Sequence, residues 1–273
     1  MPNPLKQVSR RNQLQLVLHT SHGIYPVVIG ISEPHLSASS AFYFFCFAFY
    51  LLYMRIRAIA VKIGPMSNPN STNNAALAGK IAIVTGGGHG AGAAIARLLA
   101  AAGARVAVND INPDRARRVA EEIRAAGGEA LDVMADVSNR YQCVTLIETT
   151  RAEWGRLDIL VNYAGVRPTA TVMKMDEWEL ERCLHVNLMG PFYMSQLVGR
   201  VLADQNKAGD PGGMMINIAV PEPEEGDLAA YAATQVGLPA FSRACAREFA
   251  PLGVAVHTLV TDDPVDEVKA IVL

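Results

Sequence analysis

The sequence predicts an α/β fold, a doubly wound parallel sheet in a single domain that spans residues 79–273. From residue 79 onward, short runs rich in β-branched residues alternate with stretches whose apolar residues recur at helical spacing. The strand runs are apolar on both faces, as expected when helices cover both sides of a parallel sheet. The ligand crevice of such a sheet lies at the carboxyl ends of its strands.

The first half of this region alternates four strands with three helices. A strand at 80–85 precedes a helix that ends before Gly103, and a second strand follows at 105–110. Asn112 and Pro113 open the next helix as its N-cap and its first helical residue. The series then continues with a strand at 129–135, a helix from 138 to 155 and a strand at 158–162.

The second half continues the alternation with longer helices. The predicted elements are a helix at 176–201, a strand at 214–219, a helix at 228–250 and a strand at 254–260. No internal repeat interrupts the series, so a single sheet accounts for all of these strands.

Residues 1–78 form an N-terminal extension of different composition. Residues 36–54 carry no charge, residues 41–54 are apolar without interruption, and basic residues follow. This pattern is compatible with a single membrane-anchoring helix. The favoured interpretation is that residues 1–65 are a mis-assigned start or an unstructured leader, since the sequence from Met66 reads like the beginning of an ordinary soluble protein. We expect a cytoplasmic protein, with a membrane-anchored one as the alternative.

Composition excludes several classes of function. A hydrophobic content of 51% with 18% charged residues rules out a chain that is disordered throughout. The net charge of −2 provides no basic field for a polyanion, so we expect no nucleic-acid partner. The cysteines are far apart and form no CxxC pair, which indicates reduced thiols and no metal site; they stand at positions 46, 143, 183 and 245.

A glycine-rich loop joins the first predicted strand to the first helix. Its sequence, TGGGHGAG at 85–92, lets the backbone approach a pyrophosphate, and the amides at the start of the helix supply a positive pole. Asp110 ends the next strand, where its carboxylate can accept hydrogen bonds from both adenosine ribose hydroxyls and repel a 2′-phosphate. The loop therefore predicts a dinucleotide site with NAD favoured over NADP. The alternative for Asp110 is an ordinary turn residue.

The spacing TGxxxGxG, formed by Thr85, Gly86, Gly90 and Gly92, resembles the short-chain dehydrogenase/reductase family. The other segments that resemble it, in chain order, are Asp136-Val137, LDILVNYAG, HVNLMGPF, and INIA followed by YAA. The resemblance implies a Rossmann-type NAD(P) domain that transfers hydride between the cofactor and a small-molecule alcohol or ketone. It also implies a homo-oligomer assembled through the two long helices.

Position by position, the resemblance implies a set of cofactor contacts. The glycine motif of Thr85, Gly86, Gly90 and Gly92 would hold the pyrophosphate, Asp110 the ribose, Asp136 and Val137 the adenine, and Asn162, Ala164 and Gly165 the nicotinamide side. Two of these residues have structural alternatives, because Asp136 could cap the next helix and Asn162 could satisfy a strand end. Tyr163 departs from the family, which has a second asparagine there.

The family's chemistry uses a tyrosine as general acid/base, a lysine one turn later, a serine and an asparagine. Tyr231 and Asn187 match the tyrosine and the asparagine, whereas Val220 and Gln235 replace the serine and the lysine. Gln235 can hydrogen-bond a ribose hydroxyl, but a neutral amide cannot lower the pKa of the phenol by its charge. We expect impaired catalysis, and the alternative is that Tyr231 and Asn187 are structural.

Three interpretations remain open: an impaired NAD-dependent oxidoreductase, a non-catalytic NAD-binding or scaffolding pseudoenzyme, and a truncated gene product. Thr261-Asp262 stand where the family has proline-glycine, and the sequence stops at Leu273. The resemblance therefore predicts that the substrate lid and the last strand are missing, which leaves an open pocket and an unpaired sheet edge.

Overall fold

The computed structural model describes residues 76–221 and 228–273, together with the strands β1 (Gln13–Thr20) and β2 (Gly23–Gly30). The chain divides into two compact units, residues 1–70 and 71–273, whereas the sequence-based boundary lies at 78/79. In the first unit β1 and β2 pair as an antiparallel hairpin. Alternating residues in QLQLVLHT and β-branched residues in GIYPVVIG carry the strand signal.

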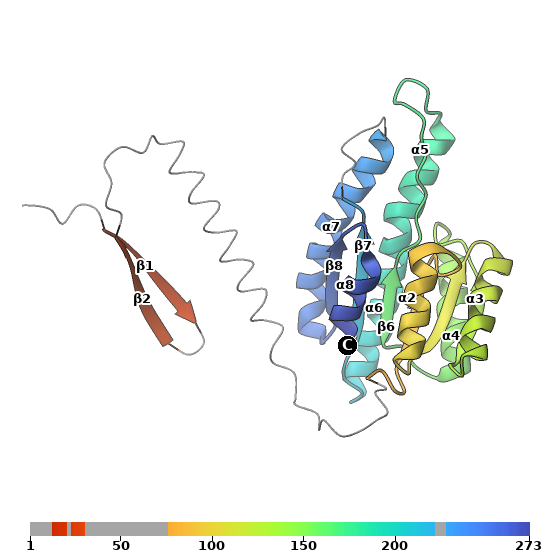
Figure 1. Cartoon of the computed structure of the whole chain (residues 1–273), viewed down its shortest axis with the longest axis horizontal. Coiled ribbons are helices and arrows are strands. Elements are labelled where there is room, and N and C mark those ends of the chain that lie inside the picture. Colours follow the sequence, from red (N-terminus) through yellow and green to blue (C-terminus); the bar gives the residue numbers. More distant parts are fainter. Residues whose placement is uncertain (1–12, 21–22, 31–75, 222–227) are drawn as a thin grey trace, which may run out of the picture. The chain divides into compact units, whose positions relative to one another are not determined.

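The second unit is built on a six-stranded parallel sheet with the order β5-β4-β3-β6-β7-β8, which confirms the predicted fold class (Figure 1). The strands are β3 (Ile81–Val84), β4 (Arg105–Asp110), β5 (Ala130–Met134), β6 (Ile159–Asn162), β7 (Met214–Ala219) and β8 (Ala255–Val260). The chain runs outward from β3 through β4 to β5, then returns to pair β6 on the other side of β3. This reversal opens a crevice at the carboxyl ends of β3 and β6.

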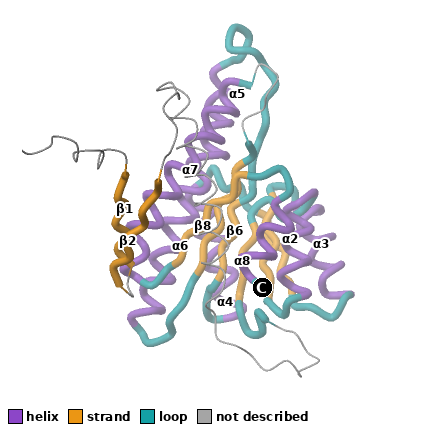
Figure 2. The backbone as a smooth tube through the Cα atoms, turned by 60° about the vertical axis from the view of Figure 1, so that its left-hand side comes forward, coloured by secondary structure: helices purple, strands orange, loops and turns teal. Residues whose placement is uncertain are grey.

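Helices cover both faces of the sheet (Figure 2). Their bounds are α2 (Gly90–Ala101), α3 (Pro113–Ala125), α4 (Arg140–Trp154), α5 (Glu177–Leu184), α6 (Gly190–Lys207), α7 (Ala229–Phe249) and α8 (Pro264–Val272), with a short 3₁₀ turn at Ala250–Leu252. One core cluster joins the sheet to α2, α3 and α8, and the other joins it to α4 and α6. The aliphatic side chains of the strands fill both layers, which explains why these strands are apolar on both faces.

The helix predicted at 176–201 is interrupted. A π-helical segment, His185–Met189, separates α5 from α6, and the amide of Gly190 donates to the carbonyl of His185. Pro191 provides the physical reason, because a proline has no amide hydrogen for the carbonyl four residues before it, which is that of Asn187. The wider turn places the side chain of Asn187 at the cleft described below.

The sheet ends at β8, which pairs only with β7 among the described strands, as the predicted unpaired edge requires. The following segment forms α8, a helix not foreseen from the sequence, in which Val268 is fully buried against the layer of α2. No helix in the described part of the chain is long and apolar enough to cross a membrane. The apolar run at 41–54 lies outside the described residues.

Candidate functional site

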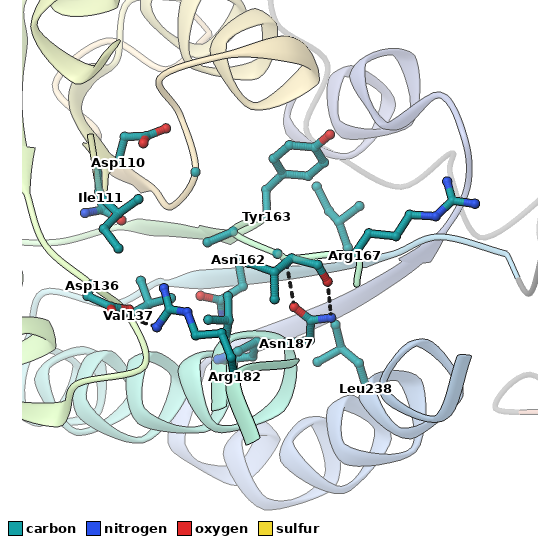
Figure 3. Close-up of a pocket in the computed structure, with 18 of the residues that line it drawn as sticks. Asp110, Ile111, Asp136, Val137, Asn162, Tyr163, Arg167, Arg182, Asn187 and Leu238 are labelled. Carbon is teal, nitrogen blue, oxygen red and sulfur yellow. Dashed lines mark hydrogen bonds and ion pairs between the residues drawn. The ribbon is translucent and has the colours of Figure 1, made fainter. Parts of the chain in front are cut away.

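A cleft of about 350 Å³ opens at the carboxyl ends of β3, β4, β6 and β7 (Figure 3). It brings together most of the predicted site residues: Gly86, Asp110, Asp136, Val137, Asn162, Ala164, Gly165, Asn187, Tyr231 and Gln235. Val220, which replaces the family's serine, also lines it. The other three predicted residues, Thr85, Gly90 and Gly92, are not part of the wall of the cleft. His89, Arg115, Arg167 and Arg182 line the cleft as well.

The glycine loop, residues 85–92, lies against the turn that follows β6. Gly86 has a φ of +65°, and a Cβ atom there would come within 2.8 Å of the Ala164 Cα. A Cβ at Gly92 would collide with the carbonyl oxygen of Gly86, so the helix also needs a glycine at this point. No side chain caps the amino end of α2, which leaves its first amides available to an anion. This backbone cradle fits a pyrophosphate.

Thr85 ties the ends of two strands together behind the cleft. Its Oγ1 accepts hydrogen bonds from the amides of Tyr163 (3.0 Å) and Ala164 (3.2 Å) and donates to the carbonyl of Val161 (3.3 Å). The side chain is buried, so the structure gives Thr85 a role in shaping the loop. A direct contact between Thr85 and the cofactor stays a prediction.

Asp110 holds the glycine loop in place. Its Oδ2 accepts from the amide of Gly88 (3.2 Å), and its Oδ1 accepts from the amide of Asn112 (2.9 Å). The His89 Nδ1 lies 3.5 Å from the same Oδ2. Asp110 is thus a turn residue and also part of the cleft wall. Each carboxylate oxygen has a second lone pair, so Asp110 can still accept a hydrogen bond from a ribose hydroxyl.

Asp136 forms an ion pair that the sequence did not reveal. The Arg182 Nη1 lies 2.8 Å from the Asp136 Oδ2, and Ser138 donates through both its amide and its hydroxyl to the Asp136 Oδ1. Burial alone would raise the pKa of Asp136, but the hydrogen bonds from Ser138 and the charge of Arg182 outweigh burial and lower it. Asn139, not Asp136, caps α4, so the helix-capping alternative is wrong.

Asn162 belongs to a buried polar chain behind the cleft. Its Nδ2 donates to the Asn217 Oδ1 (2.8 Å) and lies 3.3 Å from the Ser195 Oγ. The Asn217 Nδ2 donates in turn to the Ser242 Oγ (2.9 Å). These contacts connect β6 and β7 to α6 and α7, and they favour the structural alternative for Asn162. The sequence alone could not reveal this chain of hydrogen-bonded side chains, because Ser195 and Ser242 match no motif.

Tyr163 fills the place beside the start of α2. A Cβ at Gly92 would lie 2.7 Å from the Tyr163 Cδ1, so the ring packs directly on the glycine loop. Figure 3 shows its hydroxyl directed away from Asn162 and Asn187. Burial raises the pKa of Tyr163, which keeps the phenol protonated at neutral pH. The departure from the family pattern therefore places an additional neutral ring in the cleft wall.

Asn187 uses its amide to hold the loop after β6. Its Oδ1 accepts from the amide of Val166 (2.8 Å), and its Nδ2 donates to the Val166 carbonyl (2.9 Å), as the dashed lines of Figure 3 show. The second hydrogen of the Nδ2 goes to the Thr234 Oγ1 (3.0 Å). Both amide hydrogens are thus used within the protein. The side chain has none left for a substrate.

Gln235 connects α7 to the end of β7. Its Oε1 accepts from the amide of Val220 at 2.8 Å, and its Nε2 lies 3.4 Å from the Thr234 Oγ1. The two residues that replace the family's lysine and serine are therefore hydrogen-bonded to each other. At the serine position only an isopropyl group lines the cleft.

Tyr231 lies on α7 with 8% of its surface exposed. The guanidinium carbon of Arg167 is 5.5 Å from the centroid of its ring. Burial raises the pKa of Tyr231, and Arg167 opposes this shift without reversing it. No sequence signal indicates Arg167, because it belongs to a loop that only the fold places over α7.

Comparison with known proteins shows the family to which the chain belongs. The family model described as short chain dehydrogenase matches residues 80–262. An uncharacterised oxidoreductase of Methylorubrum extorquens is 38% identical over 186 residues, which is 67% of this chain and 72% of that protein. D-threitol dehydrogenase of Mycolicibacterium smegmatis is 35% identical over 185 residues, 67% of this chain and 69% of that protein.

A solved structure of similar fold contains a cofactor. It is a metagenomic short-chain oxidoreductase in complex with NADP, which is 31% identical with a TM-score of 0.66 and covers 72% of this chain and 91% of its own. Among the residues that the structure describes, no group of three or more histidine, cysteine, aspartate or glutamate side chains could hold a metal ion.

Proposed function

The chain belongs to the short-chain dehydrogenase family, and on that premise we propose that it binds a nicotinamide dinucleotide in the cleft, with NAD favoured over NADP. We propose further that its turnover of small alcohols or ketones is strongly impaired. The observation that carries this proposal is the 2.8 Å hydrogen bond between the Gln235 Oε1 and the Val220 amide. It joins the two positions at which the family has its lysine and its serine.

The cofactor assignment is supported by the glycine loop and by Asp110. The loop offers close backbone approach and the uncapped amino end of α2, which suit a pyrophosphate. Asp110 is buried beside the loop, and its carboxylate would repel a 2′-phosphate while accepting bonds from ribose hydroxyls. A bound dinucleotide would supply the hydride acceptor or donor that the side chains of the chain lack.

The protein groups left for chemistry are few. Tyr231 can exchange a proton through its hydroxyl, but its pKa is raised by burial, and Gln235 cannot offset that by charge. Val220 cannot donate a hydrogen bond to a substrate oxygen. Losing acid/base function costs about 10²–10⁴ in rate and losing one oxyanion-type donor about 10²–10³, without the two losses having to multiply.

Thermal unfolding of the full chain with NAD or NADP tests the cofactor proposal, because a ligand of the native state raises the melting temperature. We expect a larger increase with NAD. Asp110→Ala should weaken NAD binding more than NADP binding, since it removes both the ribose acceptor and the repelling charge. Asp114→Ala, an exposed position on α3, should change neither. Equal weakening of both cofactors by Asp110→Ala would refute the ribose assignment.

A non-catalytic NAD-binding or scaffolding protein is the second candidate. The saturated amide of Asn187 and the Gln235–Val220 bond favour it, because both suit structure better than chemistry. The two candidates differ in one measurement, hydride transfer to or from NAD across a panel of alcohols and ketones. Slow but saturable turnover supports the impaired enzyme, and NAD binding without turnover supports the scaffold.

We also propose that the protein is a homo-oligomer. A groove between α6 and α7 is lined by both apolar and charged side chains. Among the apolar ones are Phe192 and Phe241, whose ring centroids lie 5.9 Å apart. The family resemblance assigns this pair of helices to the contact between subunits. The cytoplasmic location, and the alternative anchor at residues 36–54, stay predictions.

A further inference from the structure

The guanidinium of Arg167 covers the ring of Tyr231. Its carbon lies 5.5 Å from the ring centroid, within the range in which a cation is attracted to the face of an aromatic ring. Both residues line the cleft. In the described part of the chain, Arg167 forms no ion pair with a carboxylate. Its charge therefore acts on the phenol without being neutralised by a described partner.

The backbone next to Arg167 is fixed by Asn187. The side-chain amide of Asn187 forms hydrogen bonds with both the amide (2.8 Å) and the carbonyl (2.9 Å) of Val166. Asn187 is 3% exposed and belongs to the π-helical segment, so this two-point contact comes from the buried interior. The loop is thus held at the residue that immediately precedes Arg167.

The charge of Arg167 is well placed to favour the phenolate. A phenolate shares its negative charge with its ring, so the attraction of the guanidinium increases when the proton leaves. The other groups that act on Tyr231 come from three different elements, and all of them raise its pKa: Tyr163 at the end of β6, Cys183 on α5 and Asp262 after β8. Among the described residues, only Arg167 opposes burial at this phenol.

We propose that Arg167 supplies the positive charge beside Tyr231 that position 235 lacks, as a positioning residue held by the contact of Asn187 with Val166. The inference rests on the proposed function. In the reduction of a ketone, a bound reduced dinucleotide would supply the hydride for the carbonyl carbon, and the Tyr231 hydroxyl would give its proton to the carbonyl oxygen. The electron pair of the broken O–H bond stays on the phenolate, beneath the guanidinium.

The test is the pKa of Tyr231, measured on the full chain by NMR with tyrosine labelled at Cζ and with the signal assigned by Tyr231→Phe. Arg167→Gln should raise this pKa, and Arg167→Lys should preserve most of the wild-type value because the charge remains. Arg243→Gln is the matched control, since Arg243 is an exposed residue of α7 about 18 Å further along the helix. It should leave the pKa unchanged.

Two results would overturn the inference: an unchanged pKa in Arg167→Gln, or an equal rise in Arg243→Gln. If Arg167→Gln does not fold, titration of the wild-type chain at low and high salt replaces it, because screening of an exposed cation should raise the pKa of Tyr231. If salt then leaves the pKa of Tyr231 unchanged, that result contradicts the inference.

Melting temperatures measured with NAD distinguish the two proposals. If NAD does not stabilise the wild-type chain, the proposed function is rejected. If NAD stabilises it but the pKa of Tyr231 does not change in Arg167→Gln, only the role of Arg167 is rejected.

Discussion

Two glycines of the loop share a left-handed backbone but differ in their surroundings. Gly86 and Gly90 have φ angles of +65° and +54°. A Cβ at Gly86 would lie 2.8 Å from the Ala164 Cα, whereas a Cβ at Gly90 would meet nothing within 4 Å. A comparison of alanine substitutions at Gly86 and Gly90 therefore separates the cost of the left-handed backbone from the cost of a steric collision.

Gly86→Ala should therefore destabilise the protein more than Gly90→Ala. The strained φ costs about 1–2 kcal/mol at either site, and Gly86→Ala adds the displacement of the turn after β6. Urea unfolding of the full chain measures both free energies. Gly86→Ala should also abolish stabilisation by NAD, because the loop must move. Equal destabilisation by the two variants would show that the contact with Ala164 is not tight in solution.

The two substituted catalytic positions give a gain-of-function prediction. Val220→Ser restores a hydroxyl in the cleft, and Gln235→Lys restores a cation one turn after Tyr231. Together they should raise turnover by about 10²-fold or more, measured as NADH formation or consumption. Gln235→Met, which removes the bond to Val220 without adding charge, is the control and should give no gain. An unchanged rate in the double variant would place the main defect elsewhere in the site.

At the scale of elements, β6 and β7 are joined by side chains as well as by their ladder. Asn162, Asn217, Ser195 and Ser242 are all buried, so each of their polar atoms depends on the others. A buried polar group left without a partner costs more than the bond itself contributes, because it has lost its contact with water. This buried polar chain of two asparagines and two serines thus helps to fix the positions of α6 and α7 against the sheet.

Asn217→Ala should destabilise the protein by about 1–3 kcal/mol, because it removes the acceptor of the Asn162 amide and opens a small cavity. Thr145→Ala, an exposed position on α4 whose hydroxyl bonds to the Tyr141 carbonyl, is the control and should cost much less. Denaturant unfolding provides both values. A loss below about 0.5 kcal/mol in Asn217→Ala would contradict an essential role for the buried polar chain.

At the scale of the whole molecule, buried thiols couple stability to pH. Burial raises the pKa of Cys143 to about 12, above the value of about 8.5 for an unfolded cysteine. The folded thiol therefore keeps its proton at a pH at which the unfolded thiol has lost it. The contribution of the Cys143 thiol to the free energy of unfolding is fully present below about pH 8.5. It is lost as the pH rises towards about 12, with a slope of up to about 1.4 kcal/mol per pH unit.

Cys143→Ala should flatten this alkaline loss of stability, measured as the free energy of unfolding between pH 8.5 and 11. Thr150→Val, a buried substitution on the same helix, can lower stability but should leave the slope unchanged because neither residue ionises in this range. If the free energy of unfolding of Cys143→Ala falls with pH as steeply as that of the wild type, other groups cause the alkaline transition.

The groove between α6 and α7 gives a prediction about assembly. Phe192 is 40% exposed, and Phe241 packs beside it on the neighbouring helix. Phe241→Glu should shift the protein to monomers, because it replaces an apolar ring of the contact with a carboxylate that is costly to desolvate. Light scattering after size exclusion measures the mass. Arg243→Glu, also on α7 but outside the residues that line the groove, is the control. A monomeric wild type would refute the proposed oligomer.

The sequence by itself determined the α/β class, the six strands of the sheet and most of the candidate cleft. These features rest on local signals, namely apolar periodicity, the Asn112–Pro113 helix start and the glycine spacing of residues 85–92, which short stretches of chain carry on their own. The assignment of Asn112 as N-cap is confirmed by its bonds to the amides of Asp114 and Arg115.

Only the tertiary structure decided what the polar side chains of the cleft contact. The pairing of Arg182 with Asp136, the contact of Asn187 with Val166 and the position of Arg167 over Tyr231 join residues 21–64 positions apart. Such contacts depend on how loops are folded over the sheet, and no local pattern encodes that. The same reason explains why Gln235 could be read from the sequence as a substitution, while its bond to the backbone of Val220 could not.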